Sequence, residues 1–313
     1  MIKRLKNEIQ KELIGQDALI DSLLIGLLSD GHILLEGVPG LAKTTAIKAL
    51  AKSISVDFKR VQFTPDLLPS DILGSEIYDM HSGAFKINKG PIFTNLLLAD
   101  EINRAPAKVQ SGLLEVMQER QVTISGQTHK MQRPFLVLAT QNPIDDEGAY
   151  LLSSAQLDRF MLKVVVDYPS PEDEYTIAMK VANGTFETTQ AVIDAKQLEE
   201  MKEAVKNIHI DDNLSTYIVN LIVASRDPKN YAKEGDDEDI ILYGASPRAT
   251  IDLIKASKAR AFIRGHDYVS PVDIALCVPD VLRHRLVLGY HAQSEGVSVD
   301  DLLERLLLAM PIA

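Results

Sequence analysis

A loop at residues 37–45 constrains the fold of this 313-residue chain more than any other segment. It follows a short apolar run, residues 32–35, and precedes residues 46–52, whose apolar positions have helical periodicity. The loop consists of Gly37, Val38, Pro39, Gly40, Leu41, Ala42, Lys43, Thr44 and Thr45. When a strand is followed by a glycine-containing loop and then by a helix, the backbone N–H groups of the loop and the positive end of the helix dipole point at one place. This arrangement suits a phosphate chain. The segment therefore predicts an α/β nucleotide-binding core of the P-loop kind.

Two side chains of this loop have predicted roles in binding ATP. Lys43 would reach the terminal phosphates, and the Thr44 hydroxyl would bind Mg²⁺. The nucleotide-binding pattern has Gly directly before the Lys, whereas this chain has Ala42, which is tolerated at a helical φ and disfavoured at a positive one. An ordinary glycine-rich turn between a strand and a helix, without a ligand, is the alternative interpretation.

Two carboxylates follow a second apolar segment. Residues 92–101 read as a strand buried on both faces of a parallel sheet, and they end in Asp100 and Glu101. The carboxyl ends of parallel strands meet at one edge of the sheet, so we expect this pair beside the phosphate loop. Asp100 would hold the Mg²⁺ shell and Glu101 would polarise the attacking water. An acidic helix N-terminus before Pro106 is the alternative.

A polar residue also follows the apolar segment at residues 135–140, which reads as another buried strand. The segment stops at Gln141, Asn142 and Pro143. An Asn at the tip of a strand beside the Mg²⁺ strand can hydrogen-bond the γ-phosphate or the water. A turn-forming Asn before Pro is the plain alternative.

Strand patterns and helix patterns alternate in the first part of the chain. The five predicted strands are residues 32–35, 57–63, 92–101, 135–140 and 163–166. Residues 77–87 and 120–131 read as two β-hairpins inserted between these elements. Residues 168–171, Tyr-Pro-Ser-Pro, then break all periodicity. We therefore predict an αβ core at residues 1–170, a five-stranded parallel sheet sandwiched by helices, and a second domain at residues 171–313.

The second domain reads as all-α, with no convincing strand. Its predicted helices are residues 172–182, 194–206, 212–225, 246–263, 270–288 and 298–310. An acidic stretch at residues 233–239 is expected to be a solvated, mobile loop.

Composition limits the partners of the chain. The 33 basic and 44 acidic residues give a net charge of −11, which argues against a nucleic-acid or anionic-membrane surface as the main partner. Cys277 is the single cysteine, which fits a reducing compartment. Apolar stretches fall short of the roughly 18 residues that span a bilayer. With no targeting segment visible, a cytoplasmic protein is expected.

Four motifs of the sequence resemble those of a known family. They are residues 37–44 with Ala42, residues 98–106 (Leu-Ala-Asp-Glu-Ile-Asn-Arg-Ala-Pro), residues 139–143 (Ala-Thr-Gln-Asn-Pro) and residues 156–160 (Gln-Leu-Asp-Arg-Phe). Together with the two hairpins and the helical second domain, they resemble the MoxR family, in the helix-2-insert group of the AAA+ ATPases. The resemblance covers nearly the whole chain, and the family carries Ala at the position of Ala42.

The resemblance implies further site residues. Ile14, Gly15 and Gln16 fall where such ATPases contact the adenine, although a Gly that stops a helix explains them equally well. Arg159 falls where an arginine finger reaches the γ-phosphate of the neighbouring subunit; taken alone, it would be a cation near a helix C-terminus. Arg248 falls where the lid places an arginine on the nucleotide.

Local sequence bears on two of these assignments. Ser246 as N-cap and Pro247 as the first helical residue place Arg248 at a helix start, where the dipole disfavours a cation, and this conflict favours a functional reason for it. Gln62 ends the second strand, where related ATPases carry a polar residue that restrains the catalytic Glu.

The resemblance implies an ATP- and Mg²⁺-dependent hydrolase that acts as a ring, with a hexamer expected, because an arginine finger is supplied in trans. It also implies a chaperone-like role in assembling or remodelling protein complexes or in inserting cofactors or metals, with a separate partner that carries a von Willebrand A domain. A nucleotide-gated scaffold with little turnover and a magnesium-chelatase-like motor are the alternatives. A nucleic-acid motor is disfavoured by the net charge of −11.

Overall fold

The computed structural model describes residues 1–38, 40–81, 83–142, 150–227 and 240–310. The chain divides into two units. The first comprises Met1–Leu23, His32–Leu152 and Val164–Glu199, and the second comprises Leu24–Gly31, Ser153–Lys163 and Glu200–Ala313. The boundary at residue 170 stays a prediction. None of the described helices is long and apolar enough to cross a membrane.

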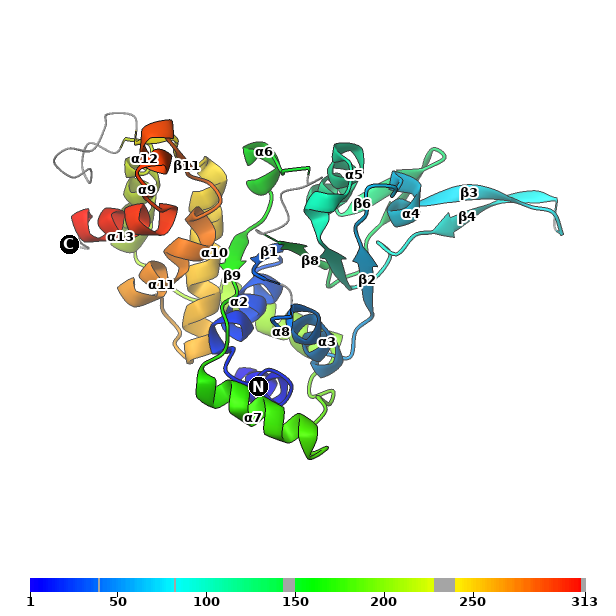
Figure 1. Ribbon diagram of the computed structural model, residues 1–313, viewed down its shortest axis with the longest axis horizontal. Helices are drawn as coiled ribbons and strands as arrows, with labels where there is room; N and C mark the ends of the chain where they lie inside the picture. The colour runs from blue at the N-terminus through cyan, green and yellow to red at the C-terminus, as the bar shows by residue number, and fades with distance from the viewer. Residues whose placement is uncertain (39, 82, 143–149, 228–239, 311–313) are drawn as a thin grey trace. The chain divides into compact units, whose positions relative to one another are not determined.

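The central sheet has the strand order β2-β5-β8-β1-β9 (Figure 1). Its strands are β1 (Ile33–Glu36), β2 (Phe58–Gln62), β5 (Leu96–Asp100), β8 (Leu136–Gln141) and β9 (Leu162–Val165). The side chains of β1, β5 and β8 are almost all buried, as their continuous apolar runs predict for strands covered on both faces. The edge strand β2 is partly exposed. The five-stranded parallel P-loop core predicted from the sequence is confirmed.

The register of the sheet brings the polar strand ends to one edge. Gln62 lies opposite Asp100 in β2 and β5, and Glu36 lies opposite Gln141 in β1 and β8. The helices around these strands are α1 (Ile2–Gln10), α2 (Asp17–Leu28), α3 (Lys43–Ser53), α5 (Ala107–Glu119) and α7 (Pro171–Ala182). Helix α3 begins at Lys43, within the phosphate-loop motif of residues 37–45, and contacts α1 and β5. The loop between β1 and α3 therefore lies at the edge where β5 ends.

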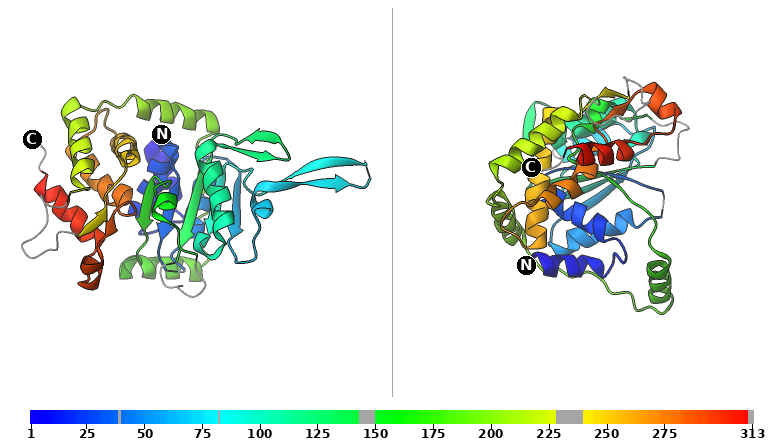
Figure 2. Two further views of the ribbon diagram at one scale, coloured as in Figure 1. Left: turned by 90° about the horizontal axis from the view of Figure 1, so that it is seen from above. Right: turned by 90° about the vertical axis from the view of Figure 1, so that its left-hand side faces the viewer.

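Both predicted hairpins are present in the first unit. The first pairs β3 (Gly74–Asp79) with β4 (Ala84–Lys89), after the short helix α4 (Pro69–Leu73). The second pairs β6 (Gln121–Ile124) with β7 (Gln127–Lys130). Figures 1 and 2 show the first hairpin extending away from the central sheet.

The second unit is mainly helical. Its longer helices are α8 (Ala195–Lys206, which begins in the first unit), α9 (Asp212–Ala224), α10 (Pro247–Arg264), α11 (Pro271–Leu282) and α13 (Val299–Ala309), and its short ones are α6 (Ser154–Leu157) and α12 (Tyr290–Ser294). Helix α10 packs against α9 and α11, and α13 packs against α9 and α11. The predicted acidic loop at residues 233–239 lies outside the described residues.

Two expectations for this unit are wrong. Strands β10 (Ile241–Tyr243) and β11 (Val287–Leu288) form a small antiparallel sheet where no strand was expected. The helix predicted to reach residue 288 ends at Leu282. Beyond this end, the buried His284 ring and the Arg285 guanidinium each bond the Phe160 carbonyl at 2.9 Å. These contacts hold His284 and Arg285 outside the helix.

A buried histidine joins a helix to a strand in the first unit. His32 lies just before β1, and its side chain is 5% exposed. The backbone N–H of Val137 in β8 donates to Nδ1 of His32 at 2.9 Å. The neutral ring therefore carries its proton on Nε2, which donates to the Met117 carbonyl near the end of α5 at 3.0 Å. The imidazole satisfies two buried backbone groups only while it is uncharged.

Candidate functional site

The phosphate loop has left-handed backbone at two positions. Gly40 has φ 91° and Ala42, the N-cap of α3, has φ 54° and ψ 16°. Ala42 is therefore in the conformation that disfavours a side chain, not in the helical one. Gly37 is required by close approach, since an added Cβ would lie 2.7 Å from the Val166 carbonyl oxygen. Pro39 lies outside the described residues.

Ala42→Gly is expected to raise the free energy of unfolding by about 0.5 kcal/mol. Glycine avoids the cost of a left-handed Cβ, and its greater freedom in the unfolded chain cancels part of that gain. Urea unfolding followed by circular dichroism measures the change. The matched control is Gly40→Ala, whose added Cβ meets no described atom within 4 Å, so that only the backbone conformation opposes it. Gly40→Ala should destabilise, and destabilisation by Ala42→Gly would contradict the assigned geometry.

Lys43 folds back across the loop that precedes it. Its Nζ donates to the Gly37 carbonyl at 2.5 Å, and the side chain is half-buried. Burial lowers the pKa of Lys43, while the nearby carboxylates of Asp100, Glu101 and Glu36 act in the opposite direction. A partly desolvated ammonium close to three carboxylates is suited to exchange its carbonyl contact for an anionic oxygen.

Thr140 of β8 orients the two acidic residues at the end of β5. Its hydroxyl donates to Asp100 Oδ1 at 2.6 Å and accepts from the Glu101 backbone N–H at 2.8 Å. Glu101 has left-handed backbone, with φ 56° and ψ 53°. The chain therefore turns sharply between the two carboxylates and holds each in a different orientation. Thr140 is not among the residues that the sequence predicts for the site, although its place at the end of a buried strand is a usable signal.

Two arginines engage these carboxylates, and the sequence analysis gave neither a role. Arg60 of β2 donates to Asp100 Oδ2, from Nη2 at 2.6 Å and from Nε at 3.0 Å. Arg104 Nη1 lies 3.2 Å from Glu101 Oε2. Gln62, expected to restrain Glu101, instead accepts a hydrogen bond from Arg60 Nη2 at 2.9 Å.

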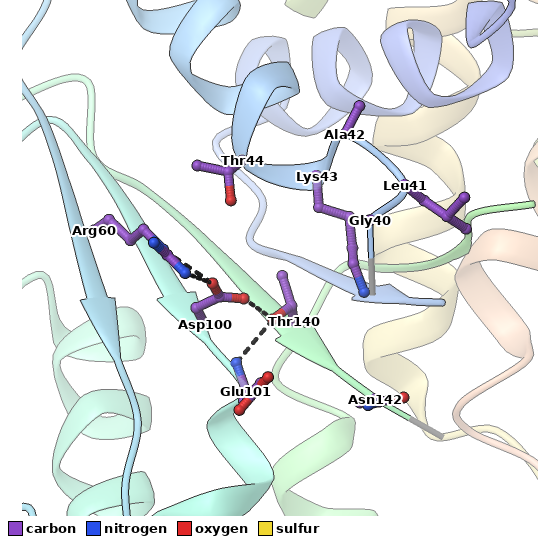
Figure 3. Close-up of a pocket in the computed structure, with 10 residues that line it drawn as sticks. All are labelled: Gly40, Leu41, Ala42, Lys43, Thr44, Arg60, Asp100, Glu101, Thr140 and Asn142. Carbon is purple, nitrogen blue, oxygen red and sulfur yellow. Dashed lines mark hydrogen bonds and ion pairs between the residues drawn. The ribbon is translucent and has the colours of Figure 1, made fainter. Parts of the chain in front are cut away.

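The loop, the carboxylates and Asn142 surround one cavity of about 350 Å³ (Figure 3). Its lining residues are Gly40, Leu41, Ala42, Lys43, Thr44, Arg60, Asp100, Glu101, Thr140 and Asn142. They come from the loop before α3, the first two residues of α3, the middle of β2 and the ends of β5 and β8. The Asn142 side chain, 8% exposed, lies at the cavity as the sequence predicts. Amide, hydroxyl, ammonium and carboxylate groups converge here in the set that a metal-bound triphosphate requires.

A second cavity, of about 480 Å³, shares Gly40, Leu41 and Ala42 with the first. Its other lining residues are Glu12, Leu13, Ile14, Gln16, Thr45, Tyr168, Pro169, Glu174, Ile177, Val181 and Phe186. Many of these side chains are apolar or aromatic, which suits the faces of a purine ring. The predicted adenine residues Ile14 and Gln16 line it, whereas the contribution of α7 was missed because an exposed amphipathic helix gives no binding motif.

Gly15 explains how the chain turns beside this second cavity. It has φ 72°, and an added Cβ would lie 2.5 Å from Asp173 Oδ2 at the start of α7. Gln16 donates from Nε2 to the Asp167 carbonyl at 3.1 Å. The helix-stop interpretation of Gly15 is therefore compatible with a place at the rim of a binding site.

Arg159 and Arg248 belong to the second unit, which is described by itself. Ser246 caps α10 and Pro247 is its first residue, as the sequence predicts. Arg248 Nη1 lies 3.0 Å from Asp158 Oδ2, the residue before Arg159. This ion pair compensates the unfavourable position of a cation at a helix start. The position of a cation at the start of α10 is therefore explained by its ion pair, and this position by itself no longer favours a functional role for Arg248.

Asp158 is a hub of the second unit. The Ser246 hydroxyl lies 3.0 Å from both carboxylate oxygens, and Arg285 Nε lies 3.1 Å from Oδ1. Arg285, whose side chain is 1% exposed, also pairs with Asp252 at 2.6 Å. Half-buried Arg159 follows this hub, and its N–H donates to the Gln156 carbonyl at 3.2 Å.

Comparisons with known proteins agree with this geometry. Residues 32–162 match the ATPase family associated with various cellular activities (AAA), and residues 234–306 match the AAA lid domain. Chaperone MoxR1 of Mycobacterium tuberculosis is 46% identical, over 97% of this chain and 81% of that protein. The protein MoxR of Paracoccus denitrificans is 31% identical, over 96% of this chain and 93% of its own. The crystal structure of a protein from Cytophaga hutchinsonii, described as an ATPase, superposes with a TM-score of 0.92 at 47% identity, covering 100% of this chain and 94% of that one.

The parallel sheet, its phosphate loop and the match to a lid domain define the fold of the AAA ATPases. Within that class, the chain belongs to the MoxR family, as the resemblance of its motifs predicted.

Proposed function

We propose that the protein hydrolyses ATP with Mg²⁺ at the cavity between the phosphate loop and strands β2, β5 and β8. The observation that carries this proposal is the convergence of Lys43, Thr44, Asp100, Glu101 and Asn142 on one cavity from separate segments of the chain. The sequence motifs alone predict a role in the site for each of these residues. An accidental glycine-rich turn would not bring them together.

The donor set fits Mg²⁺. Thr44 offers a hydroxyl and Asp100 a carboxylate, and these hard oxygen ligands suit a cation that keeps several waters and binds substrate phosphates. When bound, Mg²⁺ would neutralise charge on the phosphates.

The protein groups divide the remaining tasks. Lys43 binds the terminal phosphates, Glu101 accepts the proton of the attacking water and Asn142 orients that water or the γ-phosphate. The loop at Gly37, Val38, Pro39, Gly40, Leu41, Ala42, Lys43, Thr44 and Thr45 holds the phosphate chain with its backbone N–H groups. The second cavity, with Ile14 and Gln16 on its lining, holds the adenine.

We also propose that active sites form between subunits of a ring, in which Arg159 acts on the triphosphate of the neighbouring subunit and Arg248 on that of its own. Arg159→Ala is expected to lower kcat about 10³-fold or more. Lys43→Ala should be inactive for the separate reason that it fails to bind ATP. Neither variant alone forms a complete site.

Mixing the two variants tests whether Arg159 acts in trans. An Arg159→Ala subunit keeps its phosphate loop, and a Lys43→Ala neighbour supplies the missing arginine, so an equal mixture should recover about a quarter of wild-type turnover in a closed ring. Steady-state phosphate release measures this recovery. If the mixture stays as inactive as its components, Arg159 does not act across an interface.

The name of the relative Chaperone MoxR1 supports a chaperone-like role, which we propose here as assembly or remodelling of protein complexes, including insertion of metals or cofactors. A partner with a von Willebrand A domain would be a separate protein. The scaffold alternative predicts that purified protein retains bound ATP in a single-turnover assay. Release of one phosphate per site within minutes would exclude it.

A further inference from the structure

The guanidinium of Arg60 is the cation that contacts Asp100 in the cavity (Figure 3). Two of its nitrogens, Nη2 at 2.6 Å and Nε at 3.0 Å, donate to the same carboxylate oxygen, Oδ2. Nη2 also donates to Gln62 Oε1 at 2.9 Å. The other oxygen of Asp100 accepts from the Thr140 hydroxyl at 2.6 Å. Both oxygens of the proposed metal ligand are therefore already bonded to protein groups.

The sheet places Arg60 there. Residues two apart in a strand point to the same face, so Arg60 and Gln62 share one side of β2. The register sets Gln62 directly opposite Asp100 in the neighbouring strand. Arg60 therefore lies on a regular element and reaches the carboxylate diagonally across the strand pair. Its side chain is 48% exposed, which leaves room for it to rotate away.

We propose that Arg60 competes with Mg²⁺ for Asp100 and thereby sets how strongly nucleotide binding depends on the metal. The inference rests on the proposed function, since it concerns the same nucleotide site. Without metal, the guanidinium neutralises Asp100, whose charge would otherwise repel the phosphates. With metal, two cations contend for Oδ2, and the half-exposed ion pair is weak enough to be displaced. Arg60 is a positioning residue and not a catalytic one.

The test compares the dissociation constant of a fluorescent ADP analogue in excess EDTA with that in excess Mg²⁺. In Arg60→Met, metal-free nucleotide should bind more weakly, because the charge of Asp100 is no longer neutralised and repels the phosphates. Nucleotide with Mg²⁺ should bind more tightly, because no guanidinium competes with the metal for Asp100. The ratio of the two dissociation constants is expected to rise about three- to tenfold over that of the wild type. Binding, and not turnover, is the readout.

Two further variants sharpen the comparison. Lys59→Met removes the same charge from the neighbouring, exposed position of β2, whose side chain points to the other face, and should leave the ratio unchanged. Arg60→Lys keeps the charge but loses the two-nitrogen contact, so its ratio should lie between those of the wild type and Arg60→Met. Thermal unfolding by circular dichroism establishes that each variant is folded.

Failure of this inference differs from failure of the proposed function. If the wild type binds the analogue in a Mg²⁺-dependent way but Arg60→Met has the wild-type ratio, Arg60 does not compete with the metal and the proposed function stands. An equal rise in Lys59→Met would also overturn the inference, since the effect would then be one of general charge. If the wild type binds no nucleotide, both proposals are wrong.

Discussion

Glu101→Gln is expected to lower the rate of ATP hydrolysis about 10²- to 10⁴-fold and to leave nucleotide binding close to that of the wild type. The amide has nearly the shape of the carboxylate but cannot accept a proton from water. The backbone N–H of residue 101 donates to the Thr140 hydroxyl at 2.8 Å, and the substitution keeps this hydrogen bond because it changes only the side chain. The loss should therefore fall on kcat.

Steady-state phosphate release and equilibrium binding of a fluorescent nucleotide separate the two effects. Lys43→Ala is the contrasting variant, because it should lose binding together with turnover. Wild-type hydrolysis in Glu101→Gln would remove Glu101 from the role of general base and would favour its alternative role as a residue of an acidic helix start.

The second large effect concerns acid stability and His32. Burial and, to a lesser extent, the positive charge of Arg120 together lower the pKa of His32 to about 3, against the opposing effect of the hydrogen bond to the Met117 carbonyl. In the unfolded chain the pKa of His32 is near 6.5. Between the two pKa values, the unfolded state therefore binds a proton at His32 and the folded state does not. The contribution of neutral, buried His32 to the free energy of unfolding is complete above pH 6.5 and is lost as the pH falls towards 3. Lowering the pH from 7 to 5 should therefore decrease the free energy of unfolding by about 2 kcal/mol through His32 alone.

His32→Asn tests this origin. Asn is uncharged at both pH values and can still accept the Val137 N–H, so its absolute stability at pH 7 matters less than the difference between the two pH values. Urea unfolding at pH 7 and pH 5 should show that difference shrinking by about 2 kcal/mol relative to the wild type. The pKa of the buried His284 is also well below its ordinary value, so part of the pH dependence should remain in the variant. An unchanged difference would assign the acid sensitivity to other groups.

The parts of the site that follow from the sequence are those determined by local order along the chain. A strand, a glycine loop and a helix place Lys43 and Thr44, and buried strands that end in polar residues place Asp100, Glu101 and Asn142 at one edge. Both hairpins were predicted because alternation and turn residues are local signals. Parallel-sheet geometry then supplies the long-range arrangement without further information.

Other features depend on contacts between distant segments and were missed for that reason. Arg60 is one of two neighbouring exposed cations on β2, and only the register of β2 against β5 shows that it meets Asp100. Strand β11 has two residues, too few for any period, and its partner β10 lies far away in sequence. The left-handed backbone of Ala42 also has no sequence signal, since alanine is a poor choice for it.

The carboxylate of Asp158 links the two arginines that the proposed ring assigns to different nucleotides. It bonds Ser246 and Arg248 at the start of α10, and the next residue in the chain is Arg159. Because Asp158 is fixed to the start of α10 by these contacts, a movement of that helix start would also move the backbone of Arg159.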